Sequence, residues 1–238
     1  MSDLHANYTA LQAVLKDAGE VDETWCLGDL VGYGPDPNAV VEEIREIKNL
    51  TCLMGNHDVA VVGRMSLETF NGDAKRSLTY HEKVLTASNM DFIKSLPSKV
   101  KVRGEATMAH GSPRDPLWEY ILNSTTASLN FDYFDTPWCF VGFFFIDTTF
   151  TVIYAPALLV AQPIYPDVAL ELHPKLILNP GSVGQPRDRD PRAAYAIYDT
   201  EARTWTPRRV MYNIAEVQER IRAAGLPEKH AVRIGEGW

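Results

Sequence analysis

Residues 50–58 read Leu50-Thr51-Cys52-Leu53-Met54-Gly55-Asn56-His57-Asp58, and this stretch indicates the fold class most directly. A short, mostly apolar run of strand length leads straight into a glycine and three polar side chains. The same form occurs earlier, where Thr24 to Leu27 runs into Gly28-Asp29. The segment between these two strands has the apolar spacing of an amphipathic helix that starts near Pro37. Strand, helix and strand in this order predict an α/β arrangement of layers.

The rest of the chain extends this pattern. Apolar residues after Asn7 predict a helix that Gly19 closes. A hairpin is expected around Arg103-Gly104, because apolar residues alternate on both sides of it. The later apolar runs are predominantly strand-like, and a closing helix is predicted over Ile214 to Ala224. We expect residues 1–238 to form a single domain, since this length is within the range of one core.

Composition excludes several classes of protein. The net charge of -8 and the absence of a basic footprint argue against a stable nucleic-acid partner. The three cysteines are scattered without a C-x-x-C pair, which favours buried thiols in a reducing compartment. No apolar run is long enough for a membrane span and no basic-then-apolar leader is visible, so we expect a cytoplasmic protein with no membrane partner. The sequence leaves the oligomeric state open.

Groups that bind metals open four loops, each directly after an apolar run. The loops are Asp3-Leu4-His5, Gly28-Asp29, Gly55-Asn56-His57-Asp58 and Ala109-His110-Gly111. Ligands of open α/β sheets collect at the carboxyl ends of the strands, so these loops are expected to converge. Carboxylate, imidazole and amide donors together suit Mn, Fe or Zn. Asp29 has two carboxylate oxygens and is able to bridge two cations.

Each residue taken alone has a simpler structural explanation. Asp3 and Asp29 are suited to helix caps or turns, His110 to a satisfied interior position, and Asn56 to a left-handed turn beside Gly55. For this simpler explanation to account for all four loops, unrelated caps and turns would have to occur by coincidence at four strand ends. The recurrence therefore favours a metal centre.

The same motifs resemble the calcineurin-like metallophosphoesterases, and within them the small bacterial phosphodiesterase-like branch. The resemblance rests on D-x-H, G-D-x-V-x-Y-G-P, G-N-H-D, H-G-S-P-R-D-P-L-W-E-Y and N-P-G-S-V-G-Q-P-R-D, in this order from Ser2 to about Asp199. It implies a four-layer αββα sandwich, in which two mixed β-sheets are flanked by helices. It also implies hydrolysis of a small phosphoester, a phosphodiester or phosphomonoester, by a metal-bridged hydroxide.

Residue roles follow from this resemblance position by position. It implies one divalent ion held by Asp3, His5 and Asp29, and a second held by Asp29, Asn56 and His110. His57 is expected to face the substrate, and Asp58 to help orient His57. For substrate binding, Arg114 and Arg187 are candidates as clamps on phosphate, although arginines in such loops more often pair with nearby aspartates. Pro180 to Gly184 is not G-x-S-x-G, which excludes a serine nucleophile there.

Two departures from the pattern motivate an alternative. Similar proteins complete both metal ions with a G-H-T-H segment, whereas this chain has Phe143 and Phe145 at the two histidine positions. They also carry an apolar strand before S-D-x-H, and its absence here is expected to loosen Asp3 and His5. The alternative is a catalytically impaired relative that retains the fold as a binding module.

Overall fold

The structure, a computed structural model, describes residues 1–142, 151–154, 161–163 and 165–238. Its helices are α1 (Tyr8–Ala18), α2 (Pro37–Glu46), α3 (Asn56–Val61), α4 (Gly72–Val84), α5 (Ala87–Ser95), α6 (Ser124–Asn130), α7 (Ile214–Ala223) and α8 (Glu228–Glu236). Its strands are β1 (Thr24–Cys26), β2 (Leu50–Cys52), β3 (Lys99–Val102), β4 (Ala106–Ala109), β5 (Trp138–Val141), β6 (Thr151–Tyr154), β7 (Ala161–Pro163), β8 (Leu170–Glu171), β9 (Leu176–Leu178), β10 (Ala193–Asp199) and β11 (Thr204–Val210). Among the described residues, no helix has both the length and the apolarity to cross a bilayer.

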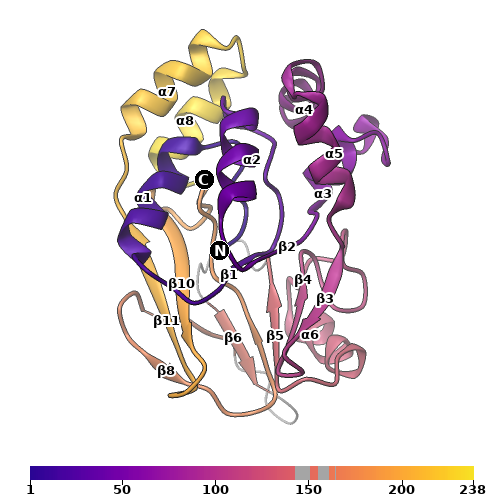
Figure 1. Ribbon diagram of the computed structural model, residues 1–238, viewed down its shortest axis with the longest axis vertical. Helices are drawn as coiled ribbons and strands as arrows, with labels where there is room; N and C mark the ends of the chain where they lie inside the picture. The colour runs from indigo at the N-terminus through magenta and orange to yellow at the C-terminus, as the bar shows by residue number, and fades with distance from the viewer. Residues whose placement is uncertain (143–150, 155–160, 164) are drawn as a thin grey trace.

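The strands form one large mixed sheet and two smaller sheets. The large sheet has the order β3-β4-β5-β9-β6-β7, with β3 antiparallel to β4 and β4 parallel to β5. The predicted hairpin around Arg103-Gly104 is therefore confirmed. The smaller sheets are the parallel pair β1-β2 and the antiparallel set β10-β11-β8. Most helices lie at the opposite end from the large sheet, and α6 lies beside its strands (Figure 1).

The start of the chain lies between the two smaller sheets. Leu27 N–H donates to the Met1 oxygen, and Asp3 N–H donates to the Gly28 oxygen. On the other side, Val183 N–H donates to the Ser2 oxygen. The first three residues thus connect β1 to the segment before β10. The loosening expected for Asp3 and His5 is not seen in their packing, because they are 2% and 0% exposed.

Alternating side chains separate three apolar clusters and so define the layers. In β5, Trp138 and Phe140 pack between the sheets, whereas Cys139 and Val141 pack against the α6 region. In β10, Tyr195 packs among helices while Tyr198 faces the other sheet. Period-two alternation of this kind gives each sheet two covered faces. The expected four-layer αββα fold is confirmed. One of its sheets is the large sheet, and the other is divided into two hydrogen-bonded pieces, β1-β2 and β10-β11-β8.

Several helices were not predicted from the sequence, among them α3, α4, α6 and α8. The closing helix was predicted correctly as α7, but the chain continues through α8. Helix α8 packs closely against α7 and brings His230 and Ile234 into the interior. This second C-terminal helix matters because it reaches the loop that follows Asp29.

Gly184 tests the contact between the N-terminal loop and residues 182–184. A Cβ at Gly184 would lie 1.8 Å from the Leu4 backbone oxygen, so Gly184→Ala requires backbone movement. We expect this variant to lower the free energy of unfolding by about 1–3 kcal/mol, as overpacking does. Gly72→Ala is the matched control, because nothing lies within 4 Å of its added Cβ. Urea denaturation compares the two variants, and equal stabilities would contradict the proposed contact.

Candidate metal centre

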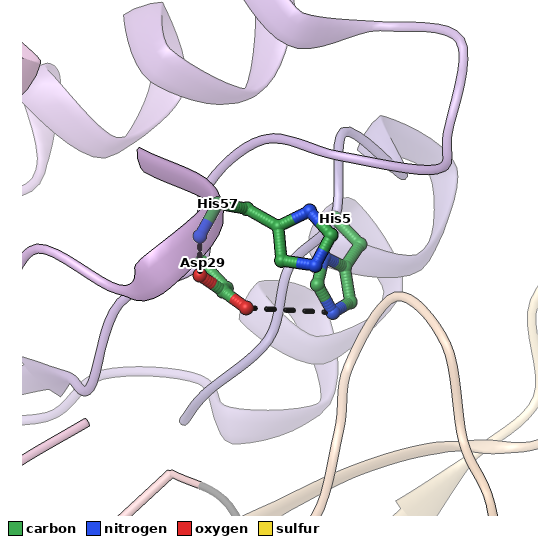
Figure 2. Close-up of side chains that lie close together, drawn as sticks. All are labelled: His5, Asp29 and His57. Atoms are coloured by element: carbon green, nitrogen blue, oxygen red, sulfur yellow. Dashed lines mark hydrogen bonds and ion pairs between the residues drawn. The ribbon is translucent and has the colours of Figure 1, made fainter. Parts of the chain in front are cut away.

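The carboxylate of Asp29 lies at the centre of the converging loops. Its Oδ2 atom is 3.4 Å from His110 Nε2 and 3.8 Å from His5 Nε2. Its Oδ1 atom accepts a hydrogen bond of 2.9 Å from the backbone N–H of His57. Figure 2 shows the carboxylate reaching towards His5 while its other oxygen meets the His57 backbone. One oxygen is therefore oriented by the backbone, and the other lies between two imidazoles.

Two groups of donors share Asp29. His5, Asp29 and His57 offer donor atoms within 4.8 Å of one another, and so do Asp3, Asp29 and His110. All of these side chains are buried. The structure thus brings together the residues that the sequence predicted, from loops far apart along the chain.

Asn56 and Asp3 complete the set of predicted ligands. Asn56 Oδ1 is 3.1 Å from His110 Nε2, and Asp3 Oδ1 is 3.4 Å from His5 Nε2. The second oxygen of Asp3 accepts a 2.6 Å hydrogen bond from Ser2 Oγ. Both predicted groupings, one around His5 and one around His110, therefore have their oxygen and nitrogen donors in mutual contact.

The histidine rings are oriented by backbone carbonyls behind the centre. His5 Nδ1 lies 3.0 Å from the Val31 oxygen, and His110 Nδ1 lies 2.9 Å from the Leu27 oxygen. A carbonyl oxygen only accepts, so each Nδ1 carries the proton and Nε2 faces the centre. This is how proteins fix the tautomer of metal-binding histidines. The donor set and its orientation fit divalent cations such as Mn, Fe or Zn.

The buried carboxylates strongly attract positive charge. Burial opposes ionisation of Asp3 and Asp29, but the neighbouring histidines hold the pKa of each carboxyl below its usual range. Burial would likewise lower the pKa of His110, yet the charges of Asp29 and Asp3 raise it to about 10. A proton on His110 and a metal ion compete for the same ring, because a ligating histidine must be neutral. The electrostatics therefore favour a cation at this place.

Glycines allow the loops to pack backbone against backbone. A Cβ at Gly55 would lie 2.1 Å from Asp29 Oδ1, and one at Gly28 would lie 2.6 Å from Gly55 N. Asp3, His5 and Asp29 have φ values of 53°, 46° and 55°, in the left-handed region where residues other than glycine are uncommon. Strain of this kind concentrates at functional sites, where the surrounding structure maintains it.

Asp58 lies beneath the centre and binds backbone groups. Its carboxylate accepts hydrogen bonds from Gly55 N–H (2.9 Å), Leu30 N–H (2.9 Å) and Val31 N–H (3.2 Å). Burial and the charge of Asp29 raise the pKa of Asp58, and the N–H donors partly offset this. Asp58 thus joins the Gly28-Asp29 loop to the start of α3. These contacts position the ligand loops, whereas the sequence suggested orientation of the His57 ring.

The two candidate arginines have different surroundings. Arg114 pairs with Glu119, which also accepts hydrogen bonds from Ser112 and Asn130. This network holds the loop after His110. Arg187 Nη2, by contrast, lies 3.4 Å from His5 Nε2. The structure therefore brings Arg187 to the centre and engages Arg114 in the loop behind it.

Several supporting residues were not identified from the sequence. Asn179 Nδ2 donates to the oxygens of Val141 and Gly142 at the end of β5, both at 2.9 Å. Ser182 Oγ donates to the Asp3 backbone oxygen at 3.2 Å, which gives this serine a structural contact. Both residues belong to the N-P-G-S-V-G motif, which was part of the family resemblance but indicated no role for either side chain. Phe143 and Phe145, which follow Gly142, lie outside the described residues.

His81 of α4 supports the loop after Asp29. Its Nδ1 accepts a 3.0 Å hydrogen bond from Gly32 N–H, so its Nε2 carries the proton that reaches the Gly34 oxygen at 2.9 Å. Ser77 Oγ accepts from Tyr33 N–H at 3.1 Å. Burial lowers the pKa of His81 to about 4. Protonation would remove the acceptor for Gly32, so the fold requires neutral His81.

This arrangement predicts acid sensitivity. The folded pKa of His81 is below the unfolded value of about 6.5, so its contribution to stability is complete above pH 6.5 and is lost as pH falls towards 4. His81→Phe should lower the free energy of unfolding at pH 7.5 by about 1–3 kcal/mol. As the pH falls from 7.5 to 4, the difference in free energy of unfolding between wild type and variant should change by about 3 kcal/mol in favour of the variant. The difference should therefore shrink or reverse. Denaturant titrations across this range measure it, and a constant difference would contradict the role of His81.

Comparisons with known proteins agree with this geometry. The model of the calcineurin-like phosphoesterase family matches residues 1–140. An uncharacterized protein of Methanocaldococcus jannaschii is 36% identical over 234 residues, covering 96% of this chain and 93% of its own length. A symmetrical bis(5'-nucleosyl)-tetraphosphatase of Erwinia tasmaniensis is 38% identical over 63 residues, which are 25% of this chain and 23% of that protein.

Solved structures extend the likeness over the whole chain. A metallophosphoesterase from Sphaerobacter thermophilus has a TM-score of 0.90 and 43% identity, covering 100% of this chain and 98% of its own. A hypothetical protein from Pyrococcus horikoshii has a TM-score of 0.80 at 20% identity, covering 100% and 97%, which shows the shared fold. The family model matches more than half of the residues, and the donor geometry agrees with that match. This chain therefore belongs to the calcineurin-like phosphoesterase family, whose members are metal-dependent hydrolases.

Proposed function

We propose that this protein hydrolyses a small phosphoester with two divalent cations bound on either side of Asp29. The observation that carries the proposal is the position of Asp29 Oδ2, between His110 Nε2 at 3.4 Å and His5 Nε2 at 3.8 Å. An oxygen in this place is suited to contact two cations at once. Mn, Fe and Zn are the metals that this mixture of donors favours.

The ligand assignment follows the contacts that pair Asp3 with His5 at 3.4 Å and Asn56 with His110 at 3.1 Å. Asp3, His5 and Asp29 would hold one cation, and Asp29, Asn56 and His110 would hold the other. When bound, two such cations supply a water whose pKa is lowered towards neutrality and positive charge for the attacking and leaving oxygens. The protein contributes rigid placement, since the ligands are buried and oriented by backbone groups. This placement reduces reorganisation during the reaction.

His57 is the residue that we assign to the substrate. Its Nδ1 lies against Gly32, where an added Cβ would come within 2.3 Å of it, and its ring centroid is 5.0 Å from that of His5. Unlike His5 and His110, it has no ring hydrogen bond within the described part of the chain. Its Nε2 is therefore left to contact the phosphoryl group or the departing oxygen. Arg187, beside His5, would add positive charge at the same face.

A second candidate function is a binding module with weakened metal affinity. It is motivated by Phe143 and Phe145, because a phenyl ring offers no lone pair to a metal. Gly142, directly before them, lies beside the proposed ligand His110, since its added Cβ would be 2.9 Å from His110 Nδ1. Metal content separates the two functions, because the module predicts less than one tightly bound ion per chain.

Activity with added metal is the first test. Purified protein with Mn²⁺ should hydrolyse bis-p-nitrophenyl phosphate, and chelation should stop the reaction. Asp29→Ala should reduce kcat/KM more than about a hundredfold, because it removes the ligand shared by both cations. Asp91→Ala is the matched control and should leave the rate unchanged, since Asp91 is an exposed carboxylate whose ion pair within the described residues is with Lys94. Wild-type protein inactive with Mn²⁺, Fe²⁺ and Zn²⁺ would contradict hydrolysis by this chain.

Restoring the missing histidines is the second test. Phe143→His with Phe145→His adds two imidazole donors after Gly142, so it should raise tightly bound Mn²⁺ towards two ions per chain. It should also increase kcat/KM. Elemental analysis after dialysis measures the stoichiometry, and Phe144→His serves as the control for added imidazole at the intervening position. Equal metal content in all three proteins would show that these positions do not face the metal centre.

A further inference from the structure

Tyr33 connects the metal centre to the C-terminal helix. Its ring centroid lies 4.6 Å from that of His5, 4.7 Å from that of His57 and 5.0 Å from that of His230 in α8. The residue is only 8% exposed, and Ser77 fixes its backbone N–H. Its hydroxyl has no hydrogen-bond partner among the described residues. A buried tyrosine ring with an unpartnered hydroxyl thus lies beside the centre.

Arg233 of α8 lies against the same ring. Its Cζ atom is 5.9 Å from the centroid of Tyr33, and its Nε donates to the Trp238 oxygen at 2.9 Å. No aspartate or glutamate side chain within the described ranges pairs with it. Other arginines of the chain do have such partners: Arg114, Arg192, Arg209, Arg220 and Arg222. The terminal nitrogens of the half-buried Arg233 therefore remain available to an anion.

Arg187 brings a second positive charge to this place. Its Nη2 lies 3.4 Å from Nε2 of His5, the residue whose ring Tyr33 also contacts. Burial lowers the pKa of Arg233, and the charge of Arg187 lowers it further. Burial raises the pKa of Tyr33, and both arginines oppose this, so both charges act on the Tyr33 phenol. Two neighbouring guanidinium groups repel each other, and an anion that contacts both would reduce this repulsion.

We propose that Arg187, Arg233 and the Tyr33 hydroxyl bind a second phosphate group of the substrate, next to the phosphate that is hydrolysed. Arginine suits this role, because its planar fork matches phosphate oxygens and stays charged. The substrate class is then a compound with neighbouring phosphates, a di- or oligophosphate ester. The inference rests on the proposed function for the place of the reacting phosphate. The site lies partly on α8, beyond the residues that the family model matches.

Binding of non-hydrolysable anions tests the proposal. Isothermal titration of the Mn²⁺-loaded protein compares methylenediphosphonate, which carries two phosphonates, with methylphosphonate, which carries one. Wild-type protein should bind the diphosphonate at least about tenfold more tightly, the effect of one charge-assisted contact. Arg233→Met should reduce this preference to about one. Tyr33→Phe, which keeps the ring, should reduce it about fivefold.

Arg222→Met is the matched control, because Arg222 is an arginine of the neighbouring helix α7 that pairs with Glu228. It should keep the full preference. A wild-type protein without preference, or an equal loss in Arg222→Met, would overturn the second phosphate site. The hydrolysis of bis-p-nitrophenyl phosphate, which has one phosphate, separates this result from the proposed function. If the protein hydrolyses bis-p-nitrophenyl phosphate but does not prefer the diphosphonate, only the second phosphate site is overturned. If it prefers the diphosphonate but does not hydrolyse bis-p-nitrophenyl phosphate, the second site is supported and the hydrolase proposal is overturned.

Discussion

The burial of two neighbouring carboxylates is the constraint on which this site depends. Asp3 and Asp29 are each 2% exposed, and the pKa of each is held low by the histidines around it. Buried charges are costly unless compensated, so this concentration of negative charge requires cations or protons in contact with it. The placement of His5 and His110 next to Asp29 Oδ2 follows from that requirement.

The fold meets this constraint by bringing loops together at one edge of the sheets. Parallel pairing places Cys26 opposite Cys52, so the loops that follow β1 and β2 emerge side by side. Their backbones approach closely because Gly28 and Gly55 lack side chains. Asp58 then joins the two loops through backbone N–H groups. Second-layer contacts of this kind hold catalytic groups in place before a substrate arrives.

The local part of this arrangement is readable from the sequence. Polar residues directly after an apolar run indicate ligands at a strand end, as in Gly28-Asp29 and Gly55-Asn56-His57-Asp58. This pattern is recognised from neighbouring residues alone, without knowledge of tertiary contacts. The non-local part is not readable. Helix α8 follows a helix stop at Gly225 and has few apolar residues, so nothing in the sequence shows that it packs against Tyr33. The direction of the Asp58 hydrogen bonds is likewise a property of the folded loops. The sequence therefore suggested that Asp58 orients His57, and did not predict that it positions the ligand loops.

The central claim is that one carboxylate serves two cations, and anomalous scattering from a crystal grown with Mn²⁺ tests it most directly. The account predicts two manganese peaks, one on the His5 side and one on the His110 side of Asp29, about 3.5–4 Å apart. No peak at Asp29, or a single peak that the carboxylate does not contact, would contradict it.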